Sequence, residues 1–243
     1  MTLADFTPVL RSEWIKIRTL RSQTGALGAV LLATVAFSAL AGADTDGPAS
    51  DPLFSVFFGV SFGQIAAVAF GATAVSAEFQ GGALRVSLAA VPRRGRWFAA
   101  KLTAIALPVL AVGLLTGLTT LAVGSATLGD RAETPGPTDG LRAVTGCALY
   151  LTLMALLAAG LTTVLRSGTG ALGILIPFLL VVSFVVGDLS GNAADFLPDR
   201  AGQVALHTRW DGSLGPWTGL AVTALWAAAA VGAGAWRLRR RDA

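Results

Sequence analysis

The segment richest in functional side chains is residues 78–101, which lies between two long apolar stretches. It opens with the carboxylate of Glu78. The glycine pair Gly81 and Gly82 should end the preceding helix, because glycine readily leaves helical backbone angles. Residues 83–90 then predict a short helix between the two apolar stretches.

This short helix is partly apolar and ends next to a basic cluster. Leu84 and Leu88 share one face, because residues four apart lie above one another on a helix. Pro92 stops the helix, since proline cannot continue the backbone hydrogen bonds. The basic residues that follow are Arg93, Arg94 and Arg96. A helix of this kind is suited to seat in a groove on a soluble partner.

The chain carries little other reactive chemistry. Its only lysines are Lys16 and Lys101, and neither follows a glycine, so the G-x-x-x-x-G-K-[ST] phosphate loop is missing. His207 is the only histidine and lies outside the apolar stretches, whereas an intramembrane serine protease needs a histidine that faces its serine. The lone Cys147 excludes a disulfide within one chain. We therefore expect no enzyme activity, cofactor or metal site on this chain.

Six apolar stretches of 18 to 24 residues, free of charged side chains, must position this segment. They are residues 24–43, 54–77, 102–124, 143–165, 170–187 and 216–236. A helix rises about 1.5 Å per residue, so roughly 20 residues cross the hydrocarbon core. The sequence therefore predicts an all-α membrane protein with six transmembrane helices, in which residues 1–243 form a single transmembrane domain. Charge-free spans also argue against proton- or ion-coupled transport.

Basic residues gather on one side of this predicted membrane domain. Of the 18 Lys and Arg residues, 14 lie in the two tails and in the loops after the second and fourth stretches, whereas 10 of the 14 Asp and Glu residues lie on the other side. Positive charge marks the cytoplasmic face, so both termini should be cytoplasmic. We expect a multi-pass protein of the cell membrane that contacts the lipid bilayer and does not bind nucleic acid.

The N-terminal residues 1–23 predict an amphipathic helix that lies in the membrane interface. Phe6, Leu10, Trp14 and Ile17 recur at steps of three and four residues, as the apolar face of a helix requires. Such a helix rests with its apolar face toward the acyl chains.

These features together resemble the permease subunits of the type-two ATP-binding-cassette (ABC) exporters. The residues that fit the family's loop pattern are Glu78, Gly82, Leu84, Arg85, Leu88, Pro92, Arg93, Arg94 and Lys101. Ala83 stands where the family usually has threonine. Residues 12–19 are similar to the family's interfacial connector helix.

The resemblance implies an exporter permease that works with a cytoplasmic ABC ATPase, which binds the ATP and magnesium, and with a second permease subunit in a homodimer or heterodimer. The 78–101 loop would couple this permease to the ATPase. Its short coupling helix would transmit closure of the ATPase to the spans. The implied docking and coupling residues are Glu78, Gly82, Ala83, Leu84, Arg85, Leu88, Pro92, Arg93 and Arg94. Residues 188–215 would form re-entrant outer segments.

Two other classes of function remain open at this point. A non-transporting membrane protein, such as an immunity or sensor-associated protein, would act by binding alone and would have no ATPase partner. An intramembrane enzyme is disfavoured, because the predicted spans hold no pair of titratable residues.

Overall fold

The computed structural model describes residues 6–43, 51–91, 93–128, 136–182, 185, 191–209 and 212–240. Within these ranges the chain forms helices joined by turns, and no described residue lies in a strand. The α-helices are α1 (Thr7–Thr19), α2 (Arg21–Ala43), α3 (Pro52–Phe57), α4 (Val60–Ser76), α5 (Ala83–Ala90), α6 (Arg94–Leu128), α7 (Pro137–Leu165), α8 (Gly168–Pro177), α10 (Pro198–Gln203) and α11 (Pro216–Arg240). The 3-10 turns are η2 (Ala77–Phe79), η5 (Gly191–Phe196) and η6 (Val204–Leu206), and η4 (Phe178–Val182) is a π-helix.

Five of these helices are long and apolar enough to cross a membrane. They span Arg21–Ala41, Val60–Phe79, Arg94–Ala126, Pro137–Leu165 and Pro216–Arg240, and each overlaps one predicted stretch. The chain therefore has the architecture of a helical multi-pass membrane protein. The remaining predicted stretch, residues 170–187, is helical through Val182, and apart from Val185 its last residues lie outside the described part.

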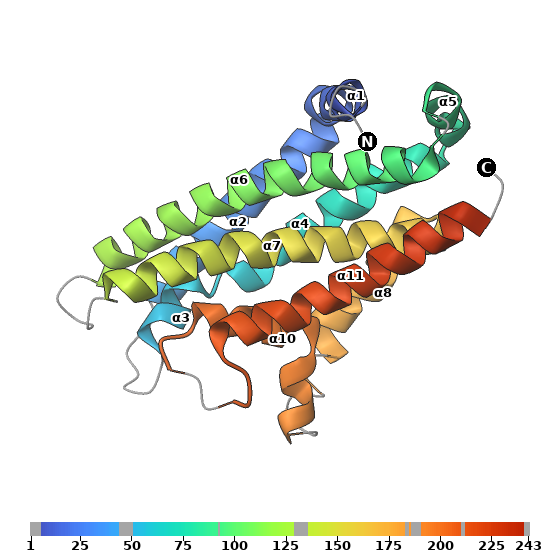
Figure 1. Cartoon of the computed structure of the whole chain (residues 1–243). Coiled ribbons are helices and arrows are strands. Elements are labelled where there is room, and N and C mark those ends of the chain that lie inside the picture. Colours follow the sequence, from blue (N-terminus) through green and yellow to red (C-terminus); the bar gives the residue numbers. More distant parts are fainter. Residues whose placement is uncertain are drawn as a thin grey trace.

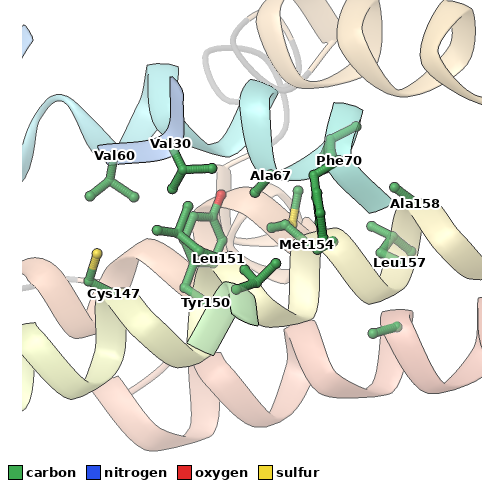
Figure 2. Packing of buried hydrophobic residues seen from close by; sticks show 14 of the residues in the cluster. Val30, Val60, Ala67, Phe70, Cys147, Tyr150, Leu151, Met154, Leu157 and Ala158 are labelled. Carbon is green, nitrogen blue, oxygen red and sulfur yellow. The ribbon is translucent and has the colours of Figure 1, made fainter. Parts of the chain in front are cut away.

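Helix α7 lies at the centre of the bundle and packs against α4, α6 and α11 (Figure 1). Its buried face carries Cys147, Tyr150, Leu151 and Met154 toward α2 and α4 (Figure 2). Glycines allow the backbones of α7 and α11 to approach each other closely. A Cβ at Gly160 would lie only 2.6 Å from the Ala230 carbonyl carbon of α11. Small residues are what allows helices to pack without a hydrophobic driving force in lipid.

The prediction that residues 54–77 form one continuous helix is wrong. The chain turns at Phe58 and Gly59, so that α3 and α4 are separate helices. Gly59 approaches the backbone of α2, where its N–H donates to Ser38 Oγ at 3.0 Å, and a side chain at this position would collide with Thr34. The break thus follows from a contact with α2, which a hydropathy pattern does not show.

Helix α6 begins at Arg94, eight residues before the predicted start of its apolar stretch at residue 102. Its first turns pack on α5 and on the last turn of α11, where Leu84, Trp97, Phe98 and Leu238 form a small buried cluster. Arg94 Nη1 donates to the Leu238 carbonyl at 2.9 Å. Helices α1 and α5 and the end of α11 therefore share one end of the bundle (Figure 1).

At the opposite end, α10 and η6 fold back onto the bundle between α7 and α11. Thr223 Oγ1 donates to the Pro198 carbonyl at 2.8 Å and anchors α10 to α11. The apolar run Val204–Leu206 is buried, as expected of a segment that caps the bundle.

Candidate functional site

Four charged side chains from three elements meet at the end of the bundle that carries α1 and α5. They are Glu13 and Lys16 of α1, Glu78 of η2 and Lys101 of α6, and we name them the ion-pair cluster. Lys101 Nζ lies 2.5 Å from Glu13 Oε2 and 2.7 Å from Glu78 Oε1. Lys16 Nζ lies 2.9 Å from Glu13 Oε1 and 2.8 Å from Glu78 Oε1. Each lysine therefore bridges the same two carboxylates.

Ser87 connects helix α5 to this cluster. Its hydroxyl donates to Glu78 Oε2 at 2.9 Å and accepts from Lys16 Nζ at 3.3 Å. The cluster thus joins α1, η2, α5 and α6 through charge-assisted hydrogen bonds, which are stronger than neutral ones.

The cluster is largely removed from water. The side chains of Glu13, Glu78 and Lys101 are only 2–3% exposed, whereas that of Lys16 is 40% exposed. Burial by itself lowers the pKa of Lys16, but hydrogen bonds and charge from Glu78 and Glu13 outweigh burial and raise the pKa. Lys16 therefore stays protonated at neutral pH. A buried ion pair adds little net stability, because the cost of removing its charges from water offsets their attraction.

The local sequence explains where α5 sits. Gly81 and Gly82 adopt positive φ angles of 58° and 76°, a region that glycine enters without strain, and they turn the chain out of η2 into α5. The predicted helix 83–90 is confirmed. Leu84 is 6% exposed and packs with Trp97 and Phe98, and Leu88 packs on the same cluster.

The inward position of Leu84 and Leu88 leaves a different face of α5 on the surface. This face, which we name the docking face, consists of Arg85, Val86, Ala89 and Ala90. Val86 is 72% exposed and is the largest apolar side chain of this face. A molecule that contacted α5 from solvent would therefore meet the docking face, because Leu84 is buried and Leu88 is half-buried.

The other residues that the sequence singled out lie close by. Gly82 is the N-cap of α5 and Ala83 its first residue. Arg93 is exposed, Arg94 binds the end of α11, and Pro92 lies outside the described residues.

Helix α1 presents its apolar side chains in two directions. Ile17 is buried, Leu10 packs on the main core and Phe6 is half-buried, whereas Trp14 is 37% exposed. The sequence pattern missed that Glu13 lies on the buried side, between Val9 and Ile17. Their four-residue spacing is the signal that places Glu13 there.

A second polar site lies at the opposite end, where Asp51 joins two segments far apart in sequence. Its Oδ1 accepts from the N–H groups of Leu53 and Phe54 at 3.0 and 3.2 Å and caps α3. Its Oδ2 accepts from the N–H groups of Thr208 and Arg209 at 2.8 and 2.9 Å.

The ring of His207 stacks on Phe54 with a centroid distance of 4.1 Å, and its Nδ1 lies 3.5 Å from Asp51 Oδ2. His207 is thus packed against α3 and close to the Asp51 carboxylate.

Asp51→Asn should lower the free energy of unfolding by about 1.5–3 kcal/mol, which is the value of hydrogen bonds to a charged group. An asparagine can keep only one of the two acceptor sides, because its amide nitrogen would face backbone N–H donors. Reversible unfolding in detergent micelles at pH 7 measures the change. A stability equal to that of the unaltered protein would contradict the role of the carboxylate as a joint.

The same joint should weaken in acid. Burial by itself raises the pKa of Asp51, but the N–H groups of Arg209, Thr208 and Phe54 and the nearby His207 lower it. Burial also lowers the pKa of His207 despite Asp51. A lowered folded-state pKa means that the unfolded state binds more protons, so stability is lost as pH falls below about 6.5 for His207 and below about 3.9 for Asp51.

Comparison with protein-family models and with curated proteins finds no match for this sequence. The likeness to exporter permeases therefore rests on the residues of the chain itself.

Proposed function

We propose that this chain is the membrane-spanning permease subunit of an ABC exporter, driven by a separate cytoplasmic ATPase that docks on α5. The observation that carries the proposal is the ion-pair cluster. Ser87 of α5 bonds to Lys16 of α1 and to Glu78, and Glu78 also pairs with Lys101 of α6, so a displacement of α5 would be passed to α1 directly and to α6 through Glu78.

The chain must take its energy from elsewhere, because it lacks a phosphate loop. On this proposal both termini and the docking face lie in the cytoplasm of a cell-membrane protein, residues 170–187 form a sixth span, and a second permease subunit completes the complex. The ATP and magnesium belong to the ATPase.

The docking face suits a partner groove with an apolar floor and an acidic rim. Val86 supplies the exposed apolar contact, and Arg85 and Arg93 supply positive charge beside it. Burying an unpaired charge in such a groove is strongly unfavourable.

Val86→Asp should therefore reduce the amount of co-purified ATPase at least about tenfold. A tenfold loss of affinity corresponds to a loss of only about 1.4 kcal/mol of binding free energy. The tagged protein is extracted from its native membrane in mild detergent, and bound proteins are identified and quantified by mass spectrometry. The expected partner is a roughly equimolar phosphate-loop ATPase.

Arg18→Glu is the matched control, because Arg18 is exposed on α1 and lies outside the docking face. It should retain the ATPase, and both variants should keep the melting temperature of the unaltered protein. A complex that contains no ATPase would overturn the proposal and favour a membrane protein that acts by binding alone.

A further inference from the structure

A pocket of about 170 Å³ lies beside the ion-pair cluster. Its walls come from α1, the first turns of α2, the end of α4, the start of α5 and α6. The apolar part of the lining consists of Ile17, Leu20, Ala74, Ala77 and Ala83. The polar part consists of Gln23 and three members of the cluster, Lys16, Glu78 and Lys101.

Gln23 gives this pocket an unused hydrogen-bond acceptor. The residue is only 2% exposed, and its Nε2 donates to Thr73 Oγ1 at 3.1 Å. Its Oε1 is buried and has no hydrogen-bond partner among the described residues. Buried polar atoms are nearly always paired, so this oxygen marks a place for a donor.

Lys101 gives the same pocket an unused donor. An ammonium group carries three N–H donors. Within the described chain, Lys101 Nζ pairs with Glu13 and Glu78, which leaves one N–H for another acceptor. A hydroxyl group serves both residues at once, because it donates one hydrogen bond and accepts others. An ammonium group would only donate, and a phosphodiester would only accept.

The surroundings of the pocket point to a lipid as the source of that hydroxyl. Leu20 lies at the junction of α1 and α2 and is 43% exposed, and Trp14 and Ile15 of α1 are 37% and 52% exposed. Exposed apolar side chains at the end of a span belong at the level of the lipid headgroups. Most of the pocket wall is aliphatic, which suits the glycerol end of a lipid.

We propose that this pocket binds a membrane lipid through a headgroup hydroxyl, which donates to Gln23 Oε1 and accepts from Lys101 Nζ. The site is independent of the exporter assignment, because it rests on the pocket and its two unused hydrogen-bonding groups alone. Bound lipid would sit against α1 and the ion-pair cluster.

The test compares two lipids that differ by one hydrogen-bonding proton, 1,2-dioleoylglycerol and its 3-O-methyl ether. Each is added to the full chain in detergent, and retained lipid is counted by native mass spectrometry. We expect one saturable molecule of dioleoylglycerol and about tenfold weaker retention of the ether, as loss of one hydrogen bond to a charged or buried partner predicts.

Two variants locate the site. Ala77→Leu fills the pocket without removing a polar group, and Gln23→Leu removes the acceptor; each should reduce retention about tenfold. Ala111→Leu, at an exposed position of α6 away from the pocket, should retain lipid fully. Ala77→Leu should also keep the melting temperature, so that its result does not depend on the folding of the Gln23 variant.

Dioleoylphosphatidylglycerol, which carries hydroxyls and a phosphate, identifies the natural lipid class. If it binds more tightly than dioleoylglycerol with the same dependence on Ala77 and Gln23, the site is supported and the lipid is anionic. Equal retention of alcohol and ether, or full retention by Ala77→Leu, would overturn the proposal, because lipid then only coats the bundle. Absence of saturable lipid would also overturn it, because the pocket then holds water alone.

Discussion

Glu78→Met is expected to lower the free energy of unfolding by about 3–5 kcal/mol, the cost of removing one partner from a buried ion pair. Glu78 accepts hydrogen bonds from Lys16, Lys101 and Ser87. Its loss leaves the Lys101 ammonium, 3% exposed, with one carboxylate instead of two. Unfolding in mixed detergent micelles, followed by circular dichroism, measures the change.

The double variant Glu78→Met and Lys101→Met should be more stable than either single variant. It removes one negative and one positive charge and leaves Glu13 paired with Lys16 at 2.9 Å. Buried ion pairs replaced by apolar side chains often cost little, and neighbouring sites couple by about 0.5–3 kcal/mol. Arg18→Met, which removes an exposed charge from α1, should change stability by no more than about 0.5 kcal/mol. Additive losses in the double variant would show that the cluster does not act as a unit.

Gly234→Leu should lower the free energy of unfolding by about 3 kcal/mol or more, at the upper end of the range for overpacked sites. A Cβ at Gly234 would lie 2.9 Å from Thr163 Cβ and 3.1 Å from the Gly160 carbonyl oxygen, so the new side chain has to push α11 away from α7. The unfolding midpoint in micelles and the folded fraction after size-exclusion chromatography measure the effect.

Gly232→Leu is the matched control, two residues away on the same helix. Apart from its two chain neighbours and the adjacent backbone of α11 itself, no described atom lies within 4 Å of a Cβ at Gly232, and the residue is exposed. Its stability should match that of the unaltered protein. Similar losses in the two variants would mean that helix α11 is sensitive to leucine in general, and would remove the argument for close packing of α7 on α11.

The elements that the sequence predicts best are those with a local signal. Helix α5 follows from two glycines and a proline that bracket eight residues, and the apolar stretches follow from their length. The break at Gly59 was missed, because its cause is contact with Thr34 and Ser38 of α2. Ser38 lies 21 residues from Gly59 in the sequence, so no local pattern shows the contact.

The ion-pair cluster could be predicted only in part. Glu78 and Lys101 flank apolar stretches and were expected to belong to the coupling loop, but their pairing with each other and with Lys16 joins residues 23 and 62 positions apart. Ser87 and Glu13 have no local feature that identifies their partners. The inward position of Leu84 was likewise hidden, because the first turns of α6, which bury it, precede the apolar stretch.

The composition of the ion-pair cluster also has an electrical consequence. Two carboxylates and two ammonium groups carry no formal net charge. Each uncompensated charge that crosses a membrane potential exchanges about 2.3 kcal/mol per 100 mV with the field. A displacement of the four cluster side chains therefore does almost no electrical work, and their movement needs the same energy in a polarised and a depolarised membrane.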